Sequence, residues 1–190
     1  MSKESLQPTP GQTVGPFFHY GMQYERGNEV SPPWDPNTVI LSGIVTDGNG
    51  DPIIDCQLEI WQPDHTGTIP QKRGSFKRDG HSFTGFGRTA TSEEGYYEFF
   101  TQNPGVVAER TTNSAPFISM IVYARGLLNK LHTRVYLPDD AEALANDDFL
   151  KTLTEEERKT LIATRLPDGS LKHDIRLQGE SETVFIAFNG

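Results

Sequence analysis

The chain carries few combinations of residues that could perform chemistry unaided. Histidine, a common ligand of transition metals, occurs five times, but no two histidines stand at the short spacing that directs both to one ion. No serine lies in the glycine-flanked turn typical of a nucleophile, and no glycine-rich phosphate loop is present. The histidines are therefore interpreted as isolated polar side chains rather than as metal ligands: His19, His65, His81, His132 and His173.

Three aspartates superficially resemble an oxygen-rich calcium loop. Asp47, Asp51 and Asp55 surround a glycine-rich turn, but they lack the spacing and the final glutamate that such a loop requires. The run Asp47-Gly-Asn-Gly50 is instead typical of a tight hairpin turn. We therefore predict a β-hairpin at this place and no calcium site.

The elements that must position any site are short and strand-like. Cys56, Leu58 and Ile60 alternate with polar residues, which is the pattern of a strand with one buried face. We predict strands at residues 39–46, 53–61, 96–101, 117–124, 132–137, 172–177 and 183–188. This number of strands predicts a mainly β protein built as a two-sheet antiparallel β-sandwich.

Two further segments complete the predicted organisation. Residues 1–37 are rich in Pro and Gly and are predicted to form an N-terminal arm that contacts a partner chain, ahead of a single β-sandwich domain at 38–190. A short helical insertion is expected near 139–165, where Thr154 and Glu157 form a capping-box pattern that opens a helix at 155–163. The polar stretch 62–84 is predicted to be a long loop with a functional or interfacial role.

Composition excludes several classes of protein. A length of 190 residues suits one domain, and the net charge of −9 argues against a nucleic-acid or anionic-membrane partner. No apolar run is long enough for a membrane span, and the N-terminus lacks an apolar signal core. Cys56 is the only cysteine, so it is predicted to be a buried inert thiol, and the cytoplasm is the expected location.

Five motifs in register identify a likeness to a known family. They are Gly67-Thr-Ile69, Phe86-Gly-Arg-Thr-Ala-Thr91, Gly95-Tyr-Tyr-Glu-Phe-Phe-Thr101, Pro104-Gly-Val-Val107 and Ser114-Ala-Pro-Phe-Ile-Ser119. Their order and spacing resemble the intradiol ring-cleaving dioxygenases, whose catalytic chains hold one ferric ion with two Tyr and two His. The resemblance implies an intradiol dioxygenase or prealbumin-like sandwich core.

Further motifs narrow the resemblance to one branch of that family. They are Thr9–Phe17, Leu58–Gln62, Ala124–Gly126 with Leu131–Arg134, Asp174–Glu180 and Glu182–Phe185. They resemble the alpha chain of the two-chain members, which pairs with a beta chain that holds Fe(III). The resemblance implies that protocatechuate and O₂ react in a cleft shared by the two chains, giving 3-carboxy-cis,cis-muconate.

The four positions that hold iron in this family carry no suitable donors here. Aligned on the shared patterns, they fall on Ile69, Val107, Phe117 and Ser119. Ferric ion prefers phenolate oxygen and imidazole nitrogen, whereas three of these side chains are hydrocarbon and the fourth is a neutral hydroxyl. The resemblance therefore implies that this chain has no metal site and no catalytic residue, and that Fe(III) is bound by the partner beta chain.

The same resemblance indicates which residues reach the shared cleft. Thr13, Gly15, Pro16 and Phe17 are expected to enter it from the arm, and Arg134 is expected to favour the anionic substrate or to brace the pocket wall. Two alternatives stay open: the arm folds over its own sandwich, or Arg134 pairs with a nearby carboxylate at 139 or 140.

Two functional readings follow from these observations. The first is an iron-free subunit that acts through association, with the arm and the segment Phe99-Phe100 supplying apolar interface. The second is a stand-alone non-catalytic β-sandwich binding module, which the fold by itself does not exclude.

Overall fold

The computed structural model describes residues 15, 18–71, 77–108 and 112–188. In chain order the elements are α1 (Phe18–Gly21), β1 (Thr38–Thr46), β2 (Gln57–Trp61), β3 (Phe86–Ala90), β4 (Tyr96–Gln102), β5 (Phe117–Tyr123), β6 (Leu131–Tyr136), α2 (Ala141–Asn146), a 3₁₀ turn (Leu150–Thr152), α3 (Glu155–Lys159), β7 (Thr164–Arg165), β8 (Leu171–Lys172) and β9 (Ile175–Arg176). None of these helices combines the length and apolarity that a bilayer span requires.

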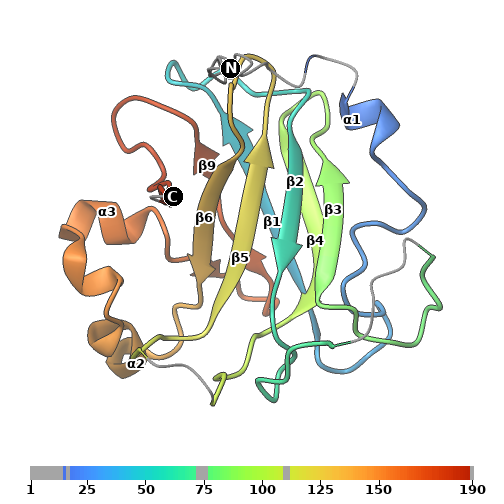
Figure 1. The fold of residues 1–190 in the computed structure, drawn as a ribbon, viewed down its shortest axis with the longest axis vertical. Helices are drawn as coiled ribbons and strands as arrows, with labels where there is room; N and C mark the ends of the chain where they lie inside the picture. The colour runs from blue at the N-terminus through green and yellow to red at the C-terminus, as the bar shows by residue number, and fades with distance from the viewer. Residues whose placement is uncertain (1–14, 16–17, 72–76, 109–111, 189–190) are drawn as a thin grey trace, which may run out of the picture.

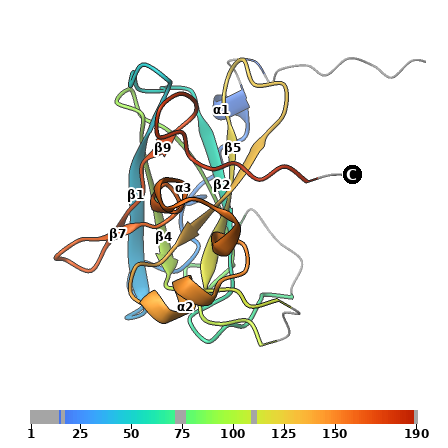
Figure 2. The ribbon, with the colours of Figure 1, turned by 90° about the vertical axis from the view of Figure 1, so that its left-hand side faces the viewer.

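The strands form the two packed sheets that the sequence predicts. One sheet has the order β4-β1-β8-β7, with β9 also pairing to β1, and the other has the order β3-β2-β5-β6. The long pairings are antiparallel, whereas the short strands β8 and β9 run parallel to β1. Figure 1 shows the sheet of β2, β3, β5 and β6 in front, and Figure 2 shows the two sheets edge-on. The β-sandwich is therefore confirmed.

The core lies between the sheets and follows from strand alternation. In β5, Ile118, Met120 and Val122 are fully buried, while the residues between them point to the outer face of the sheet. Side chains of the opposite sheet pack against them, among them Leu41, Val45, Phe99, Leu171 and Ile175. The burial of Phe99 removes it from any interface, so that expectation is wrong for Phe99.

The helical insertion packs beside the edge strand β6 and closes one end of the outer face. The predicted capping box is confirmed, with Thr154 and Glu157 exchanging side-chain and backbone hydrogen bonds, but α3 ends at Lys159. Leu161 is buried, and its carbonyl accepts a 2.8 Å hydrogen bond from the backbone amide of Tyr136 in β6. A second apolar cluster forms there: Ala115, Tyr136, Leu150 and Leu161, with Phe117, Phe149 and Ile162 packed against it.

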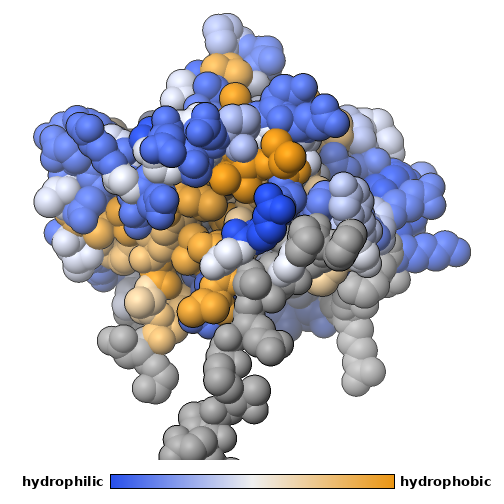
Figure 3. All heavy atoms as spheres, turned by 90° about the horizontal axis from the view of Figure 1, so that it is seen from above, coloured by the Kyte–Doolittle hydropathy of each residue, from blue (hydrophilic) through white to orange (hydrophobic). Residues whose placement is uncertain are grey.

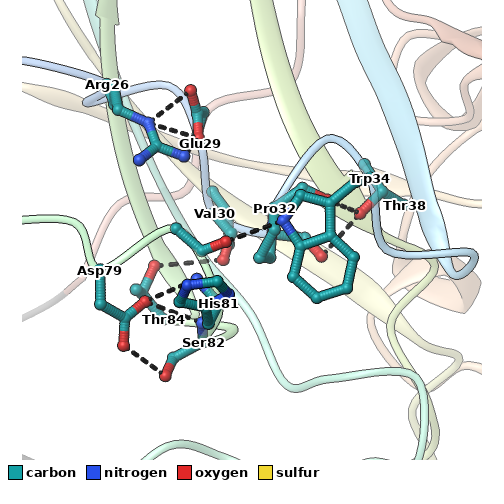
Figure 4. Close-up of polar contacts among 12 residues, drawn as sticks. Arg26, Glu29, Val30, Pro32, Trp34, Thr38, Asp79, His81, Ser82 and Thr84 are labelled. Atoms are coloured by element: carbon teal, nitrogen blue, oxygen red, sulfur yellow. Dashed lines mark hydrogen bonds and ion pairs between the residues drawn. The ribbon is translucent and has the colours of Figure 1, made fainter.

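The described part of the predicted arm binds its own sandwich. The backbone amide of Val30 donates to the carbonyl of Phe100 at 2.8 Å, and the Val30 carbonyl accepts from the amide of Thr84 at 2.8 Å. Trp34 donates its indole N–H to the carbonyl of Gly80 at 2.9 Å, although the residue is 63% exposed. Figure 4 shows Val30 and Trp34 of the arm beside Thr84 and His81 of the predicted long loop. Contact of the arm with a partner chain stays a prediction.

The predicted turn at 47–50 is confirmed, because the Asp47 amide bonds to the Asp51 carbonyl and Thr46 forms an antiparallel bridge with Pro52, although β2 itself lies in the other sheet. Two other local predictions are wrong for identifiable reasons. Residues 172–177 are split at His173 and Asp174, because an Asp174 carboxylate oxygen takes the amide of Ile44. Residues 183–188 form no strand: the amides of Thr183 and Ile186 bond to the carbonyls of Arg176 and His132, but the Val184 amide between them bonds to a threonine hydroxyl.

Two strands, β3 and the two-residue β7, were not predicted from the sequence. Nothing in the alternation of 86–90 indicates a strand, because Gly87 and Arg88 interrupt its apolar pattern, yet β3 pairs with β2 along its full length. Cys56 is buried, and burial raises the pKa of its thiol far above the ordinary range. The predicted burial of Cys56 is confirmed, and its low reactivity stays a prediction.

His173 is a buried base without full hydrogen bonding. Its Nε2 atom has no partner within the described part of the chain. Burial lowers the pKa of this imidazole from 6.5 to about 4, against a smaller opposing effect of Asp174. Because the folded state holds the neutral ring and the unfolded chain protonates at 6.5, acid favours unfolding.

This dependence of stability on pH gives a prediction. The contribution of His173 to the free energy of unfolding should be complete above pH 6.5 and should be lost as the pH falls toward 4, by about 3 kcal/mol at about 1.4 kcal/mol per pKa unit. His173→Leu should flatten the urea-denaturation stability between these pH values, and the same change at exposed His81 should not. An unchanged pH profile in His173→Leu would contradict a neutral buried ring.

Candidate functional site

The four positions aligned with iron ligands come from one end of the sandwich. Phe117 and Ser119 begin β5, Ile69 lies in the β2–β3 loop, and Val107 lies in the β4–β5 loop. Figure 1 shows both loops at the end of the sheets where β5 starts. The fold therefore gathers the segments that the sequence motifs mark.

The two loops touch through glycine backbone. The amide of Gly105 donates to the carbonyl of Asp64 at 2.8 Å, and Gly67 lies so close that an added Cβ would stand 1.9 Å from the carbonyl oxygen of Val106. Gly67 also has φ +87, which side chains rarely adopt. The glycines of Gly67-Thr-Ile69 and Pro104-Gly-Val-Val107 thus allow the loops to meet.

Hydrogen bonds within the first loop fix its shape. An oxygen of the Asp64 carboxylate accepts from the amides of Thr66 at 2.9 Å and Thr68 at 3.0 Å, and from the Thr66 hydroxyl at 2.6 Å. Burial raises the pKa of Asp64, but these hydrogen bonds outweigh it and hold the pKa below its usual value. An ionised Asp64 therefore maintains the turn that precedes Ile69.

Strand register places the other two positions on the outer face of the sheet. Ser119 pairs with Trp61 of β2 on one side and with Arg134 of β6 on the other, and Phe117 pairs with Tyr136. Phe117 and Ser119 are partly buried, in contrast to the fully buried residues between and after them. These side chains line one patch of surface together with Arg134.

The residue types at this end do not fit ferric ion. Ile69, Val107 and Phe117 offer no lone pair, and the hydroxyl of Ser119 is neutral at ordinary pH. Across the described residues, no three His, Cys, Asp or Glu side chains cluster in a way that could hold a metal. No chemistry through a bound metal can be derived from these four side chains.

Arg134 turns toward the aligned positions and away from the carboxylates. Its guanidinium carbon lies 4.2 Å from the centre of the Phe117 ring and 4.7 Å from that of Phe149, and Nη1 donates to the Tyr136 hydroxyl at 3.0 Å. Asp139 instead pairs with Arg165, and Asp140 caps α2. The alternative in which Arg134 pairs with one of these carboxylates is therefore wrong.

Three residues of this site were missed by the sequence analysis. Tyr136 is fully buried, and burial raises its pKa to about 12, although Arg134 acts in the opposite direction. Its hydroxyl lies 3.4 Å from Asp147, whose carboxylate accepts backbone hydrogen bonds from Phe149 at 2.9 Å and Leu150 at 2.8 Å. Period-two spacing from Arg134 could have indicated Tyr136, but nothing local indicates Asp147 or Phe149.

Most of the predicted arm site lies outside the described residues. This applies to Thr13, Pro16 and Phe17. Gly15 is described and has φ +75, which agrees with the predicted sharp bend before Pro16. The contribution of these four residues to a shared cleft stays a prediction.

Two hollows of the surface lie elsewhere. One of about 270 Å³ sits at the opposite end of the sandwich and is lined by the β5–β6 turn: Tyr123, Ala124, Leu127, Leu128, Asn129 and Lys130. Figure 3 shows apolar side chains gathered at that end. A groove of about 520 Å³ runs between β1, β9 and α3, and its walls carry both signs of charge. Neither is lined by an aligned ligand position.

Comparisons with known proteins agree with the motifs. The family model described as dioxygenase matches residues 15–179. The alpha chain of Pseudomonas putida protocatechuate 3,4-dioxygenase is 38% identical over 99% of this chain and 100% of its own length, and that of Burkholderia cepacia is 36% identical over 95% and 98%. The Burkholderia cepacia beta chain is 29% identical over 66% of this chain and 54% of its own.

Solved structures show the same fold. Hydroxyquinol 1,2-dioxygenase from Pseudomonas putida DLL-E4 has a TM-score of 0.58 at 20% identity, covering 92% of this chain and 68% of that one. The intradiol ring-cleavage dioxygenase from Tetranychus urticae has a TM-score of 0.55 at 18% identity, covering 90% and 93%. At these identities the likeness concerns the arrangement of the sandwich alone.

The glycine contact between the loops predicts a stability effect. Gly67→Ala should lower the free energy of unfolding by about 2–4 kcal/mol, because it adds a clash with Val106 to the strain of positive φ. Gly169→Ala is the matched control, since φ is +86 there and a Cβ would meet nothing within 4 Å of the described structure, so about 1 kcal/mol is expected. Equal losses in urea denaturation would argue against the close contact.

Proposed function

The chain belongs to the dioxygenase family, and we propose that it is the alpha subunit of a protocatechuate 3,4-dioxygenase that binds no iron. Intradiol dioxygenases are non-heme iron enzymes, and in this proposal the Fe(III) is held by a beta chain that pairs with the present one. The pair would cleave protocatechuate with O₂ to 3-carboxy-cis,cis-muconate, in the cytoplasm.

One observation carries this proposal. A chain similar over its whole length to alpha chains has no electron-pair donor able to replace Tyr or His at the four aligned positions. The bound ion would make the substrate ring reactive toward O₂, and the beta chain would supply it. What is left to the present chain is to pair with the beta chain and to complete its cleft.

Within that cleft, Arg134 is the residue proposed to attract the substrate anion. The net charge of −9 repels an anion, but salt screens this repulsion beyond about 8 Å, so a nearby guanidinium can dominate locally. Only Nη1 of Arg134 is engaged in a hydrogen bond with a described residue, so the other N–H groups are available to a carboxylate. Thr13, Gly15, Pro16 and Phe17 are proposed to border the same cleft.

A stand-alone binding module remains the second candidate. The described arm packs on its own sandwich, which is the behaviour expected of a chain that needs no partner. The two candidates predict different behaviour when a beta chain is present.

Assembly distinguishes the two candidates. Co-expressed with a beta chain that retains Tyr, Tyr and His-x-His, the chain should co-elute in gel filtration as a complex with a single iron per pair. That complex should consume O₂ with 3,4-dihydroxybenzoate, whereas the chain purified by itself should be iron-free and inactive. A chain that stays separate from the beta chain would support the binding module, and stoichiometric iron on the isolated chain would refute both.

The proposed role of Arg134 is tested in the assembled enzyme. Arg134→Met keeps much of the apolar stem but removes the cation, so kcat/KM for protocatechuate should fall by about 10–100-fold, chiefly through KM. Arg125→Met is the control, because this exposed residue pairs with Asp55 at the far end of β5. Unchanged kinetics in Arg134→Met at normal iron content would reject the substrate role.

A further inference from the structure

We propose that the guanidinium of Arg134 occupies the place vacated by the metal ion, and that its charge excludes metal ions independently of the missing ligands. The absence of donors explains why iron is not attracted to this end of the sandwich. A cation already held at this place would in addition repel an incoming metal ion. This inference concerns the chain itself and does not depend on its pairing with a beta chain.

The first support is the position of the guanidinium. Phe117 stands at one aligned ligand position, and the guanidinium carbon lies 4.2 Å from the centre of its ring. Ser119 stands at another, and it is the direct strand partner of Arg134. Ligand atoms introduced at 117 and 119 would therefore face a positive charge at close range.

The second support is that the surroundings are built to hold a cation. Phe117 and Phe149 both lie within 5 Å of the guanidinium carbon, and aromatic faces attract cations through their quadrupole. At position 117, in place of a lone pair, the chain offers a ring face that suits a planar guanidinium.

The third support is that a buried network fixes the guanidinium in place. Tyr136 accepts from Arg134 at 3.0 Å, and its own hydroxyl lies within 3.4 Å of the carboxylate of Asp147, which is fully buried. Asp147 also accepts backbone hydrogen bonds from the segment that carries Phe149. The anion, the tyrosine and the second ring thus belong to one unit around Arg134.

The positive charge of the Arg134 guanidinium opposes a trivalent ion at positions 117 and 119. Like charges a few ångströms apart repel strongly, and the partly buried, ring-lined setting screens this repulsion less than water would. A ligand set restored by substitution would still have to overcome it. Metal binding should therefore require two changes: the ligands must be restored, and the charge of Arg134 must be removed.

The test uses the full chain with the ligand set restored by Ile69→Tyr, Val107→Tyr, Phe117→His and Ser119→His. This restored chain is compared with two further variants, in which Arg134→Met removes the charge and Arg134→Lys retains it. Affinity for Fe(III) is measured by chelator competition, and tyrosinate coordination by its visible absorption. We expect the Arg134→Met variant to bind iron at least about tenfold more tightly than the other two.

Two results would overturn the proposal. One is equal affinity of the Arg134→Met and Arg134→Lys variants, whether both bind iron or neither does. The other comes from a measurement on the unaltered chain, so misfolding of a variant does not affect it. There the N–H signals of the Arg134 guanidinium should show ring-current shifts in NMR that diminish in Phe117→Leu, and unshifted signals would place the cation elsewhere.

Discussion

The pleat of β5 and β6 is the constraint on which the site depends. Because alternate residues of a strand face opposite sides, Ile118 and Val135 enter the core while Ser119 and Arg134 share the outer face. A shift of one residue in register would exchange core and surface and would separate these side chains. The tight core between the sheets therefore also determines which residues can meet outside it.

The helical insertion turns this outer face into an enclosed environment. Asp147 ends α2 and accepts backbone hydrogen bonds at the start of the 3₁₀ turn, so Phe149 is carried toward Arg134. Tyr136 belongs to β6, yet its backbone is bonded to the insertion and its hydroxyl reaches Asp147. The insertion thus supplies both a ring and a negative charge to a face that strands by themselves would leave open.

Much of the architecture follows from local pattern. Alternation in 53–61 and 117–124 predicts strands because a half-buried strand imposes a period of two, and the capping box at Thr154 has the same meaning wherever it occurs. The strand predictions that failed have a different cause, which is not local. The backbone amides of Val184 and Ile44 bond to side chains from distant segments instead of to strand carbonyls, and no local pattern reports such competition.

The sequence by itself determined that the four aligned positions hold Ile69, Val107, Phe117 and Ser119, because the donor chemistry of a side chain is a property of its type. It also determined the sandwich class and the burial of Cys56. Only the tertiary structure decided which partners Arg134 takes, since Phe149 and Asp147 lie outside its strand and reach it through the packing of the insertion. Contacts of this kind depend on where separate segments meet, which residue type and spacing do not specify.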